Sequence, residues 1–429
     1  MAPKVVIRAF TCRRDVVTAE LIRSLLEKMG CRALVTSIRD FNRTVKYWKP
    51  DVAVVNTPGN SMNLKHEFPE VKAVWLDGEG FLPEEFSHAK IMSENRAMFQ
   101  APDMILLWGE YVKKQLVEAM TNEDVAKIKV VGNPTYDLIR FRNQTREKEP
   151  AKRQSVGVVM RFGTINNHEG IPPIRTLPNP DNLERVIVEC RSFVGTIRAI
   201  QAVLDNTKFD VSLRPHPLEQ IESYDLYKHY WFKKEHLHRV NIDATLSFSH
   251  WAREQRAILS PTSTSLLEAY LLKVPVINID RLSGTDEFAN SYDELTKTWQ
   301  ASGLQPSDPT ELADILGRGL PDVKSNAALD AQIDQYCSVN GENSSSAYLC
   351  AKHIADYAFS AVANGSRRGL PMCAVDAIDR LSFWRAMRAN PLHQNMGYRR
   401  GFHKLPDDLE EIAERIWGYE CNKLRVPRI

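Results

Sequence analysis

Four consecutive apolar residues stand between polar ends in Pro50-Asp51-Val52-Ala53-Val54-Val55-Asn56. A run without polar alternation is typical of a strand that is buried on both faces of a parallel sheet. Such a sheet needs helices on both of its faces. The segment therefore predicts an α/β domain in which this run is one of the strands.

The sequence on either side of this run alternates between strand and helix patterns. Residues 4–10 predict a short strand, and residues 16–29 carry apolar side chains at helical spacing up to Gly30, which ends the helix. We expect the remaining strands of this series at residues 32–38, 73–77, 104–108 and 128–132. This alternation indicates a doubly wound, Rossmann-like domain.

A polar segment divides the chain. Residues 142–154 contain nothing to bury, so we interpret them as a linker, with a solvated surface loop as the alternative. A second series follows, with strands expected at 155–160, 209–213, 257–260 and 274–279 and helices near 184–205 and 263–272. Two such domains facing a cleft form the GT-B arrangement, which sugar-nucleotide epimerases share. We therefore predict an acceptor domain at 1–141, a nucleotide-sugar donor domain at 155–365 and a helical basic tail at 366–429.

The composition is that of an ordinary soluble globular protein. The 429 residues include 56 Lys+Arg and 54 Asp+Glu, a net charge of +2, and 43% are apolar. These values exclude a disordered chain, a collagen-like repeat and a strongly basic nucleic-acid binder. We expect no membrane-spanning helix and no signal peptide. Seven scattered cysteines without a C-x-x-C pair predict neither disulfides nor a cysteine-rich zinc site, and favour the cytoplasm.

The strongest local motif is a hydroxyl-rich turn between a strand and a helix. The strand ends at Ser260, and four hydroxyl residues follow: Thr262, Ser263, Thr264 and Ser265. Helix capping alone needs one hydroxyl, whereas a helix N-terminus with several hydroxyls suits a phosphate. Ligands of open α/β sheets bind at this edge. We predict a nucleotide phosphate site here, with Glu268 accepting bonds from the ribose or, alternatively, solvated.

A second motif, Arg214-Pro215-His216-Pro217, follows the strand expected at 209–213. The two prolines restrict the backbone on either side of His216. Its ring would donate to a phosphate oxygen and, as a cation, stabilise the charge of a departing nucleotide. Arg214 would hold the phosphate with two parallel bonds. We therefore place Arg214, His216 and Pro217 in the nucleotide site; an ordinary polar surface loop is the alternative.

Carboxylates in two loops are candidates for acid–base chemistry. Asp77 and Glu79 stand between glycines at the end of an expected strand, where one of them would take the proton of an acceptor hydroxyl. Asn166 and Asn167 would meet the donor sugar, and Glu169 is the next candidate base. An Asp/Gly turn and plain loop chemistry are the respective alternatives.

These segments together resemble the bacterial surface carbohydrate biosynthesis family over residues 70–280. The resemblance rests on Leu76-Asp77-Gly78-Glu79-Gly80, Leu107-Trp108-Gly109-Glu110, Val131-Gly132-Asn133-Pro134-Thr135-Tyr136-Asp137, Pro215-His216-Pro217 and residues 262–268. The His-Pro element followed by hydroxyls is similar to the donor site of CMP-Kdo and CMP-sialic acid transferases. It implies that His216 and the hydroxyls hold the cytidylate phosphate. Residues 132–137 also resemble UDP-N-acetylglucosamine 2-epimerases.

The resemblance implies a glycosyltransferase that moves an acidic sugar, Kdo or a nonulosonate, from a CMP-activated donor to an acceptor of lipopolysaccharide or capsule. A UDP-sugar transferase, an epimerase on the same fold and a non-catalytic GT-B-like assembly partner are the alternatives. No pair of acids one residue apart stands out as a metal-binding motif beside a strand end, and Asp77 with Glu79 comes nearest to one. We therefore expect no metal. No cofactor beyond the nucleotide-sugar and no nucleic-acid partner are expected. We expect an enzyme of the cytoplasm, with the inner face of the cytoplasmic membrane as a second location.

The tail predicts contact with an anionic surface. Residues 381–404 contain no acid, and aromatic residues are interleaved with five cations: Arg385, Arg388, Arg399, Arg400 and Lys404. Each cation near an anionic membrane contributes roughly 1 kcal/mol. We expect salt-sensitive binding to anionic liposomes, weakened by Arg399→Glu with Arg400→Glu, in a flotation assay. Binding that this pair of changes leaves intact would favour the alternatives, packing on the first domain or an acidic glycan acceptor.

Overall fold

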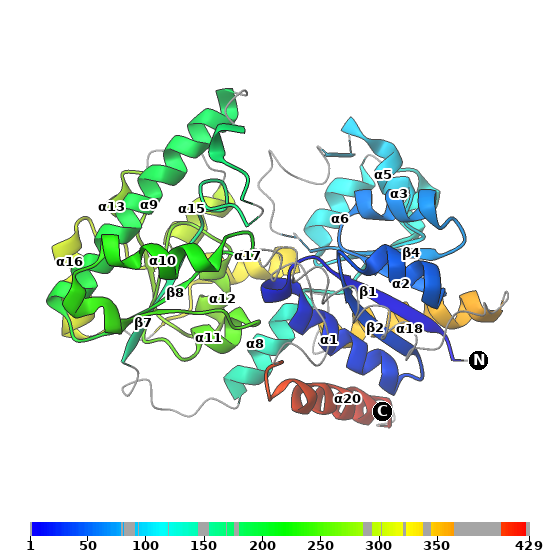
Figure 1. Ribbon diagram of the computed structural model, residues 1–429. Helices are drawn as coiled ribbons and strands as arrows, with labels where there is room; N and C mark the ends of the chain where they lie inside the picture. The colour runs from blue at the N-terminus through cyan, green and yellow to red at the C-terminus, as the bar shows by residue number, and fades with distance from the viewer. Residues whose placement is uncertain are drawn as a thin grey trace. The chain divides into compact units, whose positions relative to one another are not determined.

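The computed structural model describes residues 2–78, 80, 91–92, 94–118, 120–144, 154–168, 170–175, 180–285, 294–301, 303–320, 323–337, 345–363 and 405–425. The chain forms two compact units (Figure 1). Unit 1 is Met1–Leu138 with Ala331–Ile429, and unit 2 is Ile139–Asp330. We expected the second domain to end at residue 365, whereas unit 2 ends at Asp330.

Unit 1 is built on a six-stranded parallel sheet in the order β2-β1-β3-β4-β5-β6. Its strands are β1 (Lys4–Ala9), β2 (Arg32–Ser37), β3 (Val52–Val55), β4 (Lys72–Leu76), β5 (Met104–Leu107) and β6 (Ile128–Val130). All of β3 is buried, and its Val54 lies between Ile7 of β1 and Val74 of β4. The expected α/β domain is confirmed.

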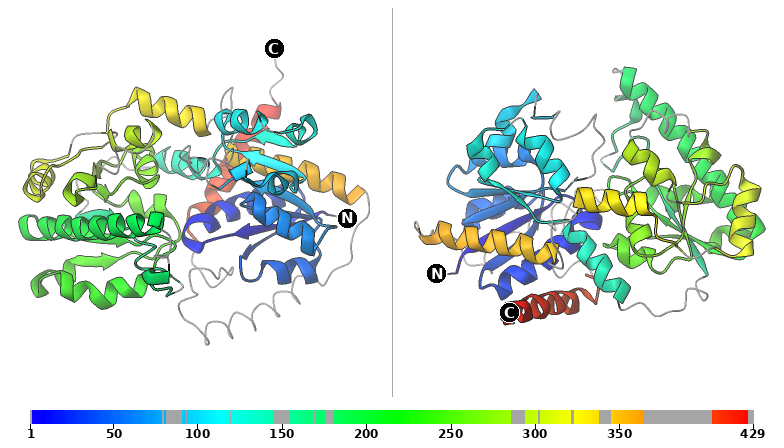
Figure 2. Two further views of the ribbon diagram at one scale, coloured as in Figure 1. Left: turned by 90° about the horizontal axis from the view of Figure 1, so that it is seen from above. Right: turned by 180° about the vertical axis from the view of Figure 1, so that it is seen from behind.

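Helices cover both faces of this sheet. The helices of unit 1 are α1 (Cys12–Lys28), α2 (Phe41–Trp48), α3 (Pro58–Glu67), α5 (Arg96–Gln100), α6 (Glu110–Val117), α7 (Asn122–Ala126) and the first part of α8 (Pro134–Gln144), and from later in the chain the end of α17 (Ala327–Cys337), α18 (Ser346–Ala363) and α20 (Leu409–Arg425). Figure 2 shows α18 and α20 beside α1. The small buried residues of α18, such as Ala351 and Ala358, allow this close approach.

The end of the chain returns to unit 1 through α20. Ser24 of α1 donates to Glu410 over 3.1 Å, and Lys28 pairs with Glu414. The basic residues 381–404 lie outside the described residues. Among the helices that the structure describes, none is both long and apolar enough to cross a membrane.

Unit 2 has a five-stranded parallel sheet in the order β11-β10-β7-β8-β9. Its strands are β7 (Ser155–Val159), β8 (Asp210–Arg214), β9 (Val240–Ile242), β10 (Ile258–Ser260) and β11 (Val276–Asn278). Its helices include α9 (Pro180–Asn206), α10 (Ile221–Trp231), α11 (Phe248–Ala252), α12 (Ser265–Leu271), α13 (Asp280–Ser283), α15 (Glu294–Ala301) and α16 (Pro309–Arg318). Because β8 follows β7 on one side and β10 returns to its other side, the direction of winding changes between β7 and β10.

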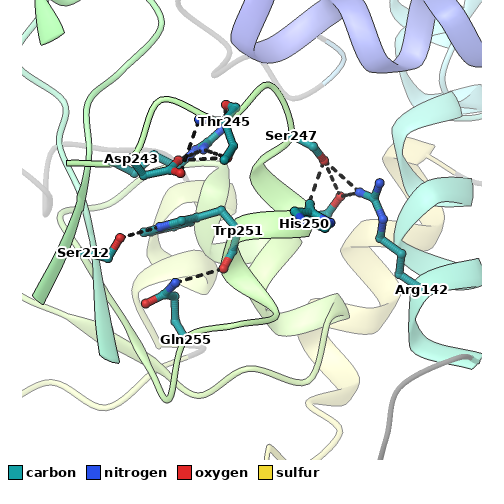
Figure 3. Close-up of polar contacts among 10 residues, drawn as sticks. Arg142, Ser212, Asp243, Thr245, Ser247, His250, Trp251 and Gln255 are labelled. Atoms are coloured by element: carbon teal, nitrogen blue, oxygen red, sulfur yellow. Dashed lines mark hydrogen bonds and ion pairs between the residues drawn. The ribbon is translucent and has the colours of Figure 1, made fainter. Parts of the chain in front are cut away.

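The first residues of the segment expected as a linker, 142–144, belong to α8, and the boundary between the two units lies earlier, between Leu138 and Ile139. Arg142 lies in the last turn of α8 and is only 1% exposed. Its guanidinium donates to Ser247 Oγ over 2.8 Å and to Ser249 Oγ over 2.5 Å, at the start of α11 (Figure 3). These hydroxyls replace the water that the cation loses on burial, so an arginine in a polar run is buried. Residues 145–153 lie outside the described residues.

The segment at 131–137 has a structural role in unit 1. Ser345 caps α18 by accepting from the Tyr348 N–H, and the buried Asp137 carboxylate accepts from Ser345 Oγ and the Ala347 N–H, both over 2.7 Å. Gly132 has φ +81°, and a Cβ atom there would lie 2.1 Å from Ser346 Oγ. The glycine and the aspartate of this motif therefore seat the N-terminus of α18.

Replacing Asp137 tests this seat. Asp137→Ala leaves the Ala347 N–H and Ser345 Oγ without their acceptor, and should lower the free energy of unfolding by about 2 kcal/mol. Urea unfolding followed by circular dichroism measures the change. Asp356→Ala on α18, which removes only an exposed ion pair with Lys352, should change this free energy by less than about 0.5 kcal/mol. Equal losses in the two variants would contradict the assignment.

Candidate functional site

An exposed arginine stands where the winding of the second sheet changes. Arg161 follows β7 by two residues, and its Nη1 donates to the carbonyl oxygen of Thr262, in the turn after β10. In open α/β sheets the ligand binds at this topological switch point, beyond the carboxyl ends of the strands. We did not predict Arg161 as a site residue. The signal for it was present, since it follows the first strand of the second series.

The hydroxyl turn divides into a buried and an accessible part. Thr262 is buried, and its N–H and hydroxyl both bond to the carboxylate of Asp280, to which Asn278 also donates. Thr262 therefore holds the turn in place. Thr264 is exposed, whereas Ser263 and Ser265 are half-buried and hydrogen-bonded to each other over 3.3 Å.

His216 occupies a defined position after β8. Its ring is half-buried, and Nδ1 accepts from the backbone N–H of Leu218 over 3.2 Å. A nitrogen that accepts carries no proton, so in the neutral ring the proton is on Nε2. The loop therefore sets the tautomer and leaves Nε2–H as the donor of the ring. Pro215 before it is buried, and Pro217 after it is half-buried.

Arg214, which we expected to hold a phosphate, is buried in the interior instead. Its Nη1 contacts the Asp243 carboxylate and, over 3.0 Å, Thr245 Oγ1, while Nη2 donates to the Thr245 carbonyl oxygen. The guanidinium lies 5.4 Å from the centre of the Trp251 ring. Burial lowers the pKa of Arg214, and the charge of Asp243 opposes this. Figure 3 shows Asp243 hydrogen-bonded to Thr245, with Trp251 below them. Arg214 thus organises the loop after β9.

A buried carboxylate joins the loops that follow β7 and β8. Glu219 has no exposed surface; it accepts from the Phe162 N–H and from the Tyr224 hydroxyl, each over 2.5 Å. Burial, followed by the charge of Glu219, raises the pKa of Tyr224 well above its usual value. The Glu219 N–H donates to the His216 carbonyl oxygen over 2.9 Å. Because Phe162 follows Arg161, this one side chain positions the backbone beside both candidate ligands of a phosphate.

The two asparagines also hold these loops. Asn166 donates from its amide to the Gln220 carbonyl oxygen over 2.9 Å, and Asn167 donates to the Gly163 carbonyl oxygen over 3.3 Å. Their contact with a donor sugar stays a prediction. Glu268 is half-buried on α12.

Of the three candidate bases, the structure describes only Asp77. Asp77 follows β4 in unit 1, is 2% exposed, and its N–H donates to the Leu106 carbonyl oxygen over 2.9 Å. Glu79 and Glu169 lie outside the described residues. In the part of the chain that the structure describes, no three His, Cys, Asp or Glu side chains are grouped to hold a metal ion.

The similar proteins that the comparisons found are solved structures. No family model and no curated protein sequence matches the chain. The UDP-GlcNAc 2-epimerase of Methanocaldococcus jannaschii, in complex with UDP-GlcNAc and UDP, is similar at TM-score 0.50 and 13% identity, over 83% of this chain and 100% of that one. MnaA of S. aureus with UDP is similar at TM-score 0.50 and 11% identity, over 86% and 100%.

A third similar structure is the wall teichoic acid polymerase TagF, at TM-score 0.53 and 13% identity, over 85% of this chain and 90% of that one. The fold is of the GT-B type. This confirms two Rossmann-like units with parallel sheets and additional C-terminal helices. At such low identity the likeness concerns the fold alone.

The Glu219 contacts predict a specific loss of stability. Glu219→Gln replaces one acceptor oxygen by an amide nitrogen, which donates and cannot accept, so the Phe162 N–H or the Tyr224 hydroxyl loses its partner. A hydrogen bond to a charged group contributes roughly 1.5–3 kcal/mol, and we expect a loss of that size in urea unfolding. Glu222→Gln, at an exposed position of α10, is the matched control and should change stability by less than about 0.5 kcal/mol. Wild-type stability of Glu219→Gln would show that the carboxylate is dispensable.

Proposed function

We propose that the chain is a glycosyltransferase of surface carbohydrate biosynthesis that binds its nucleotide-sugar donor at the switch point of unit 2. The observation that carries this proposal is the set of groups after three neighbouring strands. Ser263, Thr264 and Ser265 follow β10, Arg161 follows β7, and His216 follows β8. Adjacent strands are about 4.8 Å apart, so β10 and β8, on either side of β7, are about 10 Å apart. In this proposal the side chains and a bound diphosphate together bridge that distance.

The chemistry of these groups suits a departing nucleotide. Arg161 supplies a positive charge, His216 donates from Nε2, and the accessible hydroxyls donate to the remaining phosphate oxygens. Together they stabilise the negative charge that grows on the phosphate as the bond to the sugar breaks. Glu268 accepts from the ribose hydroxyls in this proposal, and Asp77 takes the proton of the acceptor hydroxyl.

The contacts of three acids that the structure describes near this edge favour transfer over epimerisation. Asp243 pairs with Arg214, Asp280 holds Thr262, and Glu219 joins two loops. An epimerase must remove a proton from a sugar carbon, and carboxylates committed to such contacts do not serve as that base. An epimerase remains the second candidate, because two of the similar structures are UDP-GlcNAc 2-epimerases or bind UDP.

For the donor we keep the CMP-activated acidic sugar, on the resemblance of the His216 and hydroxyl motifs to CMP-sugar transferases. A UDP-sugar is the alternative, supported by the UDP ligands of the similar structures. The proposal includes no metal, with Arg161 and His216 supplying the positive charge. Activity that is lost in EDTA and restored by Mg²⁺ would overturn that part.

Removing the proposed phosphate ligands should weaken nucleotide binding. Charge-assisted hydrogen bonds contribute roughly 1.5–3 kcal/mol each, so Arg161→Ala and His216→Ala should each raise the Kd by about 10-fold to 100-fold. Calorimetric titration with CMP, CDP and UDP measures the change. Arg198→Ala, which removes an exposed cation of α9, should leave the Kd unchanged. Unaltered affinity in both site variants would place the nucleotide elsewhere.

Asp77 should act in transfer and not in donor binding. Asp77→Asn keeps the shape of the side chain but removes the proton acceptor, so transfer should fall at least about 100-fold while the Kd for the nucleotide stays constant. Product formation from CMP-Kdo and an acceptor, followed by mass spectrometry, gives the rate. Thermal unfolding establishes that the variant is folded, and Glu110→Gln in the same unit serves as the control. Full activity of Asp77→Asn would move the role of base to another residue.

A further inference from the structure

Unit 2 contains a recess between α9 and α10. It has a volume of about 410 Å³, and residues 165–167 and 170–173, after β7, form part of its wall. The two helices lie side by side here, since the Gln201 amide of α9 donates to the Trp231 carbonyl oxygen of α10 over 2.7 Å. None of the phosphate ligands proposed above lines this recess.

Aromatic rings form the apolar part of the recess. Phe193 meets Trp231 edge to face at 5.2 Å between ring centres, and Tyr224 meets Trp231 at 6.1 Å. Tyr227, one turn of α10 after Tyr224, is 46% exposed and lies 6.5 Å from Trp231. Rings that pack against one another have few rotamers available. The recess is therefore a preformed surface, with Tyr227 at its open side.

The recess also contains polar side chains that can donate hydrogen bonds to a ligand. Gln220 Oε1 accepts from Ser223 Oγ over 3.1 Å, and this bond directs the amide so that Nε2 remains a donor. The Trp231 indole N–H and the Tyr227 hydroxyl are further donors among the side chains that line the recess. Ligand sites combine apolar walls with a few placed polar groups of this kind.

The described lining carries no charged side chain. A phosphate or a carboxylate would enter it without a counter-charge, so the recess suits a neutral ligand. A pyranose ring has apolar C–H faces, which stack on aromatic rings, and a rim of hydroxyls, which hydrogen-bond to amides, indoles and phenols. The volume is at the lower end of the range for small-molecule sites, about 300–1,000 Å³, and accommodates one or two such rings.

The recess lies close to the proposed reaction site along both loops. Gln220 is four residues after His216, and Ile165 is four residues after Arg161. Four residues span at most about 14 Å, which is the length of two to three linked sugars. We infer that this recess binds a neutral sugar of the acceptor glycan while another sugar of the same glycan reacts, so that Asn166 and Asn167, which line the recess, contact the acceptor and not the donor sugar. The inference rests on the proposed function and deepens it, because it makes the acceptor an oligosaccharide.

Saturation-transfer NMR on the full chain tests the inference. Maltose, cellobiose and di-N-acetylchitobiose serve as neutral sugar probes, and uridine tests whether the recess binds a nucleoside instead. We expect a saturation-transfer signal from at least one disaccharide. In Tyr227→Ala the Kd of that disaccharide should rise about three-fold to ten-fold, because a ring contact is lost. Gln220→Ala should give a loss of similar size without removing an aromatic ring. Tyr230→Ala is the matched control, since Tyr230 is 75% exposed on the same helix and does not line the recess.

Two outcomes overturn the inference: no transfer to any disaccharide, or a signal that Tyr227→Ala and Gln220→Ala leave unchanged. Uridine signals that these two variants abolish would also overturn it, since the recess would then hold a base. Titration of the same samples with CMP and UDP separates this result from the proposed function. Nucleotide binding without sugar binding contradicts the inference alone, whereas sugar binding without nucleotide binding contradicts the proposed function.

Discussion

The carboxylate of Glu219 is the contact on which the organisation of unit 2 depends. Without exposed surface, it accepts from the Phe162 N–H and the Tyr224 hydroxyl, and its own N–H donates to the His216 carbonyl oxygen. A buried carboxylate is tolerated only when such donors replace its water. The loops after β7 and β8 are therefore held together by a charge that neither loop alone could bury. The residues beside it, Arg161 and His216, gain defined positions without themselves being buried.

Two arginines near the same sheet edge have opposite roles for one physical reason. Arg214 ends β8, where its side chain is enclosed by Asp243, Thr245 and the Trp251 ring, so its charge is neutralised inside the unit. Arg161 lies beyond the end of β7, contacts one carbonyl oxygen and stays exposed. Only the second can give its charge to a ligand. In the proposed phosphate site, the positive charge is therefore supplied by Arg161, after β7, and not by Arg214, before the Pro-His-Pro turn.

The strands and helices could be predicted from the sequence because their signals are local. The apolar run of β3, the helical spacing of α1 and the hydroxyls before α12 each report their own element, and the structure confirms them. Partnerships across the chain leave no such signal. Asp243 is 29 residues from Arg214, and Ser247 is 105 residues from Arg142, so a phosphate ligand and a linker were expected where the structure has buried, paired cations. The return of α18 to α1 depends equally on a distant contact, the Asp137 cap.

The decisive measurement is a crystal structure with the nucleotide among CMP, CDP and UDP that binds most tightly. We expect its phosphate at the junction of β7 and β10, within hydrogen-bond distance of Arg161, His216 Nε2 and at least one hydroxyl of residues 263–265. The contradictory result is a nucleotide whose phosphate contacts none of these side chains, for example one bound at the corresponding switch point of unit 1, between β1 and β3.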